Sequence, residues 1–101
     1  MAEGKTAAKA RREQRSKGKE LRLDGLSREE LHRMLRQMLL GRRFEEKSAE
    51  AYALGKIGGF CHLYIGQEAV AVGVAAALRP ADNMVAAYRD QVQALVKGMT
   101  P

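Results

Sequence analysis

Cysteine, proline and aromatic residues are scarce in this chain of 101 residues, and the scarcity excludes several classes of protein. The single cysteine cannot form an intramolecular disulfide, and no apolar segment near the start resembles a secretory signal, so a cytoplasmic protein is expected. Long apolar runs are also missing, because the stretch over residues 69–78 is only about half of the roughly 18 residues that a membrane span needs. Cys61, His32 and His62 lack the spacing of zinc ligands, and no metal site is predicted within the chain.

Positive charge is concentrated at the start of the chain. Residues 1–23 hold eight lysines and arginines against three glutamates, which gives +5 of the formal net charge of +6. No aromatic residue lies among these charges, so the stacking platform of a single-strand nucleic-acid binder is missing. We interpret residues 1–25 as a basic disordered tail, with weak attachment to RNA, an acidic partner or an anionic surface as the alternative. Three glutamates and the lack of an apolar stripe argue against a mitochondrial transit peptide.

Helical periodicity begins at Ser27, which forms a capping-box pattern with Glu30. Apolar residues at helical spacing then predict a helix over residues 27–54, closed by Gly55 in the left-handed conformation. Its leucine and methionine stripe predicts core packing or a subunit interface. Gly41 interrupts this helix and predicts either a bend or the close approach of a neighbouring helix.

The remaining pattern is that of an α/β protein. A second helix is expected over residues 67–78, apolar almost all round and therefore buried between other elements. Residues 83–87 are typical of a short buried strand in a parallel sheet, and a third helix is expected from about residue 90 to 98. One strand cannot make a sheet, so either other chains supply its neighbours or residues 26–101 are the first, mostly helical part of a larger α/β domain.

The stretch from residue 58 to 69, with the sequence GGFCHLYIGQEA, is the most unusual part of the chain. Glycine, aromatic, thiol and imidazole groups crowd into a turn that leads directly into a helix, which is typical of a binding site. The Tyr-Arg-Asp run at residues 88–90 follows the predicted strand, where open α/β sheets bind ligands, and Arg89 there suits a phosphate. The residues alone leave alternatives open, because Arg89 could pair with the neighbouring aspartate or Glu68, and His62 could have a purely structural role.

These two runs, together with RRFEEK at residues 42–47, closely resemble the alpha subunit of E1 enzymes of the thiamine diphosphate-dependent 2-oxo acid dehydrogenase family. The resemblance covers residues 31–101 and is closest to the pyruvate dehydrogenase type. It implies the N-terminal portion of a thiamine diphosphate-binding fold. It also implies cofactor binding by four residues, of which the histidine is the candidate catalytic residue: Phe60, His62, Tyr88 and Arg89.

The resemblance further implies an activity, cofactors and partners. The expected reaction is oxidative decarboxylation of pyruvate with acyl transfer to lipoyl groups, in a heterotetramer with an E1 beta subunit that serves a lipoyl-bearing acyltransferase E2. Mg²⁺ is expected to accompany thiamine diphosphate, with ligands that follow residue 101, so these 101 residues alone are expected to be inactive. Gln91 replaces a histidine typical of pyruvate-type members, which leaves a branched-chain 2-oxo acid as one alternative and a truncated docking module for E1 subunits as another.

Overall fold

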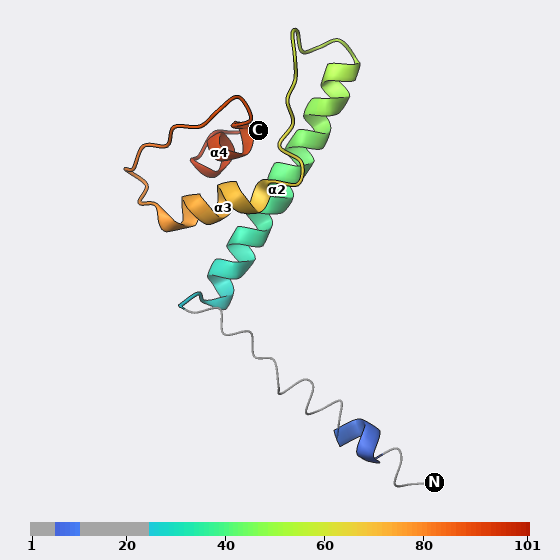
Figure 1. Ribbon diagram of the computed structural model, residues 1–101, viewed down its shortest axis with the longest axis vertical. Helices are drawn as coiled ribbons and strands as arrows, with labels where there is room; N and C mark the ends of the chain where they lie inside the picture. The colour runs from blue at the N-terminus through green and yellow to red at the C-terminus, as the bar shows by residue number, and fades with distance from the viewer. Residues whose placement is uncertain (1–5, 11–24) are drawn as a thin grey trace.

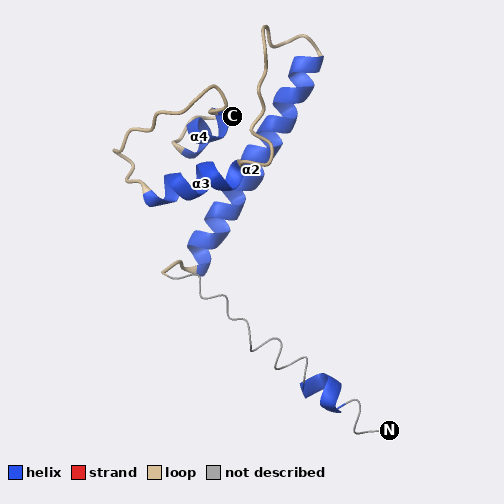
Figure 2. Cartoon of the chain, in the orientation of Figure 1, coloured by secondary structure: helices blue, strands red, loops and turns tan. Residues whose placement is uncertain are grey.

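The computed structural model describes residues 6–10 and 25–101 (Figure 1). Three labelled helices form the body of this region: α2 spans Arg28–Ala53, α3 spans Glu68–Ala77 and α4 spans Gln91–Val96. Residues 6–10 form a further short helical segment. The predicted disordered tail falls largely on residues 1–5 and 11–24, which lie outside the described residues. Figure 2 shows helices and loops but no strand in the described part of the chain.

Helix α2 begins and ends within one residue of the predicted positions. At its start the Ser27 hydroxyl accepts a hydrogen bond from the Glu30 amide at 3.1 Å, and the Glu30 carboxylate accepts one from the Ser27 amide at 2.7 Å. At its end Gly55 has a φ of 72°, a left-handed conformation that a side chain would disfavour. The capping box and the glycine cap are therefore confirmed.

Gly41 lies where α2 meets the other two helices. The residue is buried, and a Cβ atom at this position would lie 3.0 Å from Cγ1 of Val92 and 3.7 Å from Cγ of Glu68. Helices α3 and α4 both pack against α2 and against each other. Of the two explanations for this glycine, the close approach of a neighbouring helix is confirmed.

We expect Gly41→Val to lower the free energy of unfolding by about 1.5 kcal/mol, because the added methyl groups would overlap the Val92 side chain. Gly73→Val in α3 is the matched control, since no atom lies within 4 Å of its Cβ position and both substitutions replace a helical glycine. Urea denaturation of the two variants measures the difference. Equal losses would contradict the idea that Val92 limits the size of residue 41.

Helix α3 is buried on one side only, contrary to the prediction of burial all round. Ala71 and Val72 are buried, whereas Val70 is 62% exposed and Val74 is also exposed. On α2, Leu35 of the apolar stripe is likewise exposed, so the expectation of core packing there is wrong within this chain. The sequence pattern correctly identified the apolar surfaces of α2 and α3, but packing among three helices does not bury all of that surface.

The predicted buried strand at residues 83–87 is also wrong. This segment is irregular, Val85 in it is 97% exposed, and no backbone–backbone hydrogen bond of the described residues involves it. A strand is defined by its pairing with a neighbour, and no described segment lies beside this one as a partner. The segment is attached at its start, where Nζ of Lys97 donates to the carbonyls of Pro80 and Asp82 at 3.1 and 2.7 Å.

Candidate functional site

The loop over residues 54–67 carries most of the unusual stretch, and its path is set by the two helices that it joins. Helix α2 ends at Ala53, but α3 begins beside the middle of α2, where Arg42 contacts Glu68. The loop must therefore run back along α2 before α3 begins (Figure 1). This return path brings its residues next to the segment that precedes α4.

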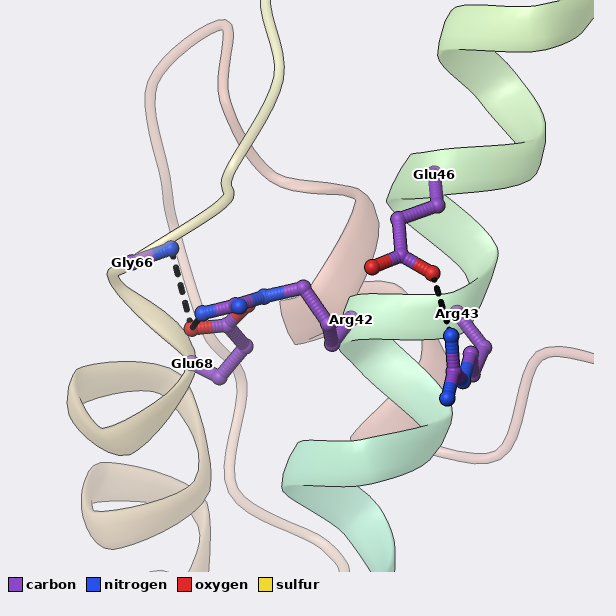
Figure 3. Close-up of polar contacts among 5 residues, drawn as sticks. All are labelled: Arg42, Arg43, Glu46, Gly66 and Glu68. Carbon is purple, nitrogen blue, oxygen red and sulfur yellow. Dashed lines mark hydrogen bonds and ion pairs between the residues drawn. The ribbon is translucent and has the colours of Figure 1, made fainter.

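An ion pair between Arg42 and Glu68 holds the start of α3 against α2 (Figure 3). Nε of Arg42 donates to Oε1 of Glu68 at 2.5 Å and Nη2 donates to Oε2 at 3.3 Å, while the Gly66 amide donates to Oε2 at 3.0 Å. The Glu68 side chain is 5% exposed, whereas that of Arg42 is 43% exposed. The hydrogen bond from Arg42 lowers the pKa of Glu68, so the buried carboxylate remains charged at neutral pH.

The structure brings the four predicted site residues together. The His62 and Tyr88 rings meet edge to face with centroids 4.7 Å apart, and the Phe60 ring is stacked toward that of His62 with centroids 6.5 Å apart. The guanidinium carbon of Arg89 is 5.5 Å from the centroid of the Tyr88 ring. Phe60 is 92% exposed, and Tyr88 is 68% exposed.

Arg89 is not neutralised by a carboxylate. Its Nη1 donates to the carbonyl oxygen of Leu63 at 2.5 Å, and none of the ion pairs in the described part of the chain involves it. Glu68 is paired with Arg42 instead, so the alternative of a salt bridge from Arg89 is wrong. Arg89 and Tyr88 also line a hollow of about 380 Å³ beside α3. The guanidinium has N–H groups to spare for an anion at this place.

Gln91 is a site residue whose contact was not predicted. Its Nε2 donates to the carbonyl oxygen of His62 at 3.1 Å. This bond links the first residue of α4 to the loop over residues 54–67, which we call the aromatic loop. The sequence singled this residue out only as a departure from a family pattern. No local signal could reveal the contact, because the two partners are 29 positions apart.

Glu45 is a second residue whose environment was not predicted. It is 0% exposed, and neither carboxyl oxygen has a hydrogen-bond partner in the described residues. Burial raises the pKa of Glu45, the backbone of Tyr64 acts in the opposite direction, and the charge of Glu68 adds a smaller rise. Glu46, the next residue of the same helix, is exposed, and nothing in the sequence separates the two glutamates.

Stability should therefore depend on the pH through Glu45. Between the ordinary pKa of 4.5 and the raised pKa of the folded state, the folded chain holds a proton that the unfolded chain has lost. Stability that is present at acid pH is thus lost as the pH rises through this window. We expect Glu45→Gln to abolish that loss of stability and to raise the free energy of unfolding by about 1 kcal/mol at neutral pH.

Urea midpoints measured from about pH 4 to pH 8 test this expectation. Glu46→Gln is the matched control, since Glu46 is the next residue of the same helix and is exposed. A Glu45→Gln profile that runs parallel to the wild-type profile would contradict the assignment.

No three His, Cys, Asp or Glu side chains of the described residues come together as possible metal ligands. None of the described helices combines the length and the apolar character needed to cross a lipid bilayer. The expectation that Mg²⁺ ligands follow residue 101 stays a prediction.

Residues 36–101 match the family described as Dehydrogenase E1 component, and the chain belongs to this family. Particular relatives are alpha subunits of the pyruvate dehydrogenase E1 component. The one from Zymomonas mobilis is 55% identical over 75 residues, which cover 73% of this chain and 21% of the relative. The one from Rhizobium meliloti is 53% identical over 74 residues, which cover 73% of this chain and 21% of the relative.

A plant relative, the chloroplastic subunit alpha-3 from Oryza sativa, is 49% identical over 74 residues, which cover 73% of this chain and 17% of the relative. The chain spans about a fifth of the length of the curated relatives that it matches. No solved structure matches it. The four predicted site residues all lie within the segment that matches the family.

Proposed function

We propose that the chain is part of the alpha subunit of a pyruvate dehydrogenase (acetyl-transferring) E1. Its reaction would be the oxidative decarboxylation of pyruvate, with transfer of the acyl unit to a lipoyl group. The observation that carries the proposal is the group formed by Phe60, His62, Tyr88 and Arg89, which gathers at one exposed place. The identities of 49 to 55% with pyruvate dehydrogenase alpha subunits support the choice of pyruvate over a branched-chain 2-oxo acid.

The residues fit the diphosphate of thiamine diphosphate. Arg89 is without a carboxylate partner in the described residues, lies half-buried at the edge of a hollow, and uses one N–H group on Leu63. Its other N–H groups and the Tyr88 hydroxyl would hold phosphate oxygens, since a guanidinium donates two parallel hydrogen bonds to such a group. When bound, the cofactor supplies the carbanion stabilisation that decarboxylation of a 2-oxo acid needs.

His62 and Phe60 would act on the side of the group that faces solvent. Histidine changes charge near neutral pH, so the His62 imidazole would hold or deliver a proton at the carbonyl oxygen of the substrate. Contact with the Tyr88 ring limits the directions in which this imidazole can point. The exposed Phe60 ring would close over the bound molecules and exclude water from them.

The proposed function includes partners that would cover the exposed apolar surface. An E1 beta subunit would complete the site in an alpha-beta heterotetramer, a lipoyl-bearing E2 would take the acyl unit, and Mg²⁺ would bind through residues after 101. Apolar side chains that stay exposed on α2 and α3, such as Leu35 and Val70, suit burial against such neighbours. The assembly would work in the cytoplasm.

The test is to purify the protein that contains this chain from its source cells, together with whatever subunits accompany it. Turnover of pyruvate and of 3-methyl-2-oxobutanoate is then measured with an artificial electron acceptor, before and after removal of thiamine diphosphate and Mg²⁺. We expect turnover of pyruvate that is lost without cofactor and restored by it. Preference for the branched substrate would redirect the proposal, and a beta-subunit complex without any turnover would favour the docking module.

A further inference from the structure

Two successive carbonyl groups of the aromatic loop are each bound by a side chain at or just before the start of α4. Nε2 of Gln91 donates to the carbonyl oxygen of His62 at 3.1 Å, and Nη1 of Arg89 donates to that of Leu63 at 2.5 Å. In the described part of the chain, no backbone–backbone hydrogen bond involves residues 57–63. These two side chains therefore supply the hydrogen bonds that hold this stretch in place.

The two donors differ in what else they are free to bind. Arg89 is charged and lies at the hollow beside α3, where the N–H groups that it does not use on Leu63 remain for an anion. Gln91 is neutral, and its Oε1 atom is buried without a partner in the described residues. Gln91 does not line that hollow, so its bond to His62 is separate from the place where Arg89 would hold an anion.

We propose that Gln91 is a positioning residue for His62. By holding the carbonyl of His62 it fixes the backbone of that residue, and the imidazole stays against the Tyr88 ring at 4.7 Å and 61°. A loop ordered in advance avoids the entropy loss that binding would otherwise incur. The inference rests on the proposed function only where it concerns cofactor binding, because the positioning itself is a property of the free chain.

Nuclear magnetic resonance of a histidine-labelled chain tests the positioning directly. The chain has two histidines, and His32 on α2 serves as the internal reference. The measured quantity is the nuclear Overhauser effect between the His62 and Tyr88 rings. Gln91→Glu keeps the shape of the side chain but replaces the donor by a carboxylate that faces a carbonyl oxygen, and so removes the hydrogen bond.

Gln93→Glu is the matched control for this measurement. It makes the same change of charge in the same helix, and the Gln93 side-chain oxygen is also buried without a partner. We expect the His62–Tyr88 effect to fall about fivefold in Gln91→Glu and to be unchanged in Gln93→Glu, with His32 unaffected in both. An undiminished effect in Gln91→Glu would overturn the inference.

If Gln91→Glu fails to fold, as judged from the methyl signals of Val92, the same measurement is made on Gln91→Asn. That variant adds no charge and shortens the side chain by one methylene group, so its amide falls short of the carbonyl. The expected and contradicting outcomes are the same as for the glutamate variant.

A second measurement separates this inference from the proposed function. In the assembly with its beta subunit, Gln91→Glu should weaken thiamine diphosphate binding about tenfold. If the wild-type assembly binds no thiamine diphosphate while the ring contact depends on Gln91, the proposed function fails and the positioning role stands. If the wild-type assembly binds the cofactor and Gln91→Glu binds it equally well, Gln91 does not position His62 for the cofactor and the inference is overturned.

Discussion

Arg89→Ala should weaken thiamine diphosphate binding about a hundredfold in the assembled enzyme, the scale of removing one partner from a partly desolvated charge pair. Two contacts would be lost together, the proposed one to the diphosphate and the one to the Leu63 carbonyl at 2.5 Å. Arg89→Lys should lose about tenfold, because an ammonium group keeps the charge without the planar fork. Isothermal titration calorimetry with thiamine diphosphate and Mg²⁺ measures both effects.

Arg79→Ala is the matched control for that prediction. Arg79 is an exposed arginine that pairs with Asp82 at 2.9 Å just after α3, away from the aromatic group. Its removal should leave thiamine diphosphate binding unchanged. Equal affinities of the Arg79 and Arg89 variants would show that Arg89 does not bind the diphosphate.

Arg42→Met should lower the free energy of unfolding by about 3 kcal/mol, because it leaves the buried Glu68 carboxylate without its cation. Glu68→Gln should cost less, about 1 kcal/mol, since the half-exposed Arg42 can turn to water. We therefore expect Arg42→Met to lose more stability than Glu68→Gln. Urea denaturation at neutral pH measures both.

The pH dependence provides a second check on this ion pair. The pKa of Glu68 is lowered by Arg42, so the pair adds stability above the unfolded-state pKa that is lost as the pH falls through the folded-state pKa. Arg42→Met should flatten this acid limb. Arg43→Met is the control, because Arg43 pairs with Glu46 in a more exposed setting and should change stability by about 0.5 kcal/mol or less. Equal losses of stability in Arg42→Met and Arg43→Met would contradict the idea that only Arg42 neutralises a buried carboxylate.

The features that were predicted correctly from the sequence are those that depend on neighbours along the chain. Ser27 and Gly55 mark the ends of α2 because capping uses groups within one turn of the helix. The residues of the aromatic group could be chosen in advance because their types and their resemblance to a family indicated them. Their roles in binding and catalysis remain proposals.

The features that were missed depend on contacts between distant parts of the chain. Glu45 carries no local mark that separates it from Glu46, and its burial follows from the packing of other elements against α2. Residues 83–87 have the composition of a strand, but whether a strand forms depends on a partner segment, and none of the residues that the structure describes lies beside them as one. The contact of Gln91 with His62 joins the start of α4 to the loop over residues 54–67, and their approach is set by the whole helical arrangement.

The narrow contact zone of α2 has a mechanical consequence. Gly41 and Glu45, the buried residues of this helix, lie one turn apart near its middle, so the closest packing of the helix against its neighbours is at this place. From Gly41 to the end of the helix at Ala53 is a lever of about 18 Å at 1.5 Å per residue. A tilt of about 5° at this pivot would move the start of the aromatic loop by about 1.6 Å. A small rocking of α2 would thus shift one end of the loop while the side chains at the start of α4 hold the other.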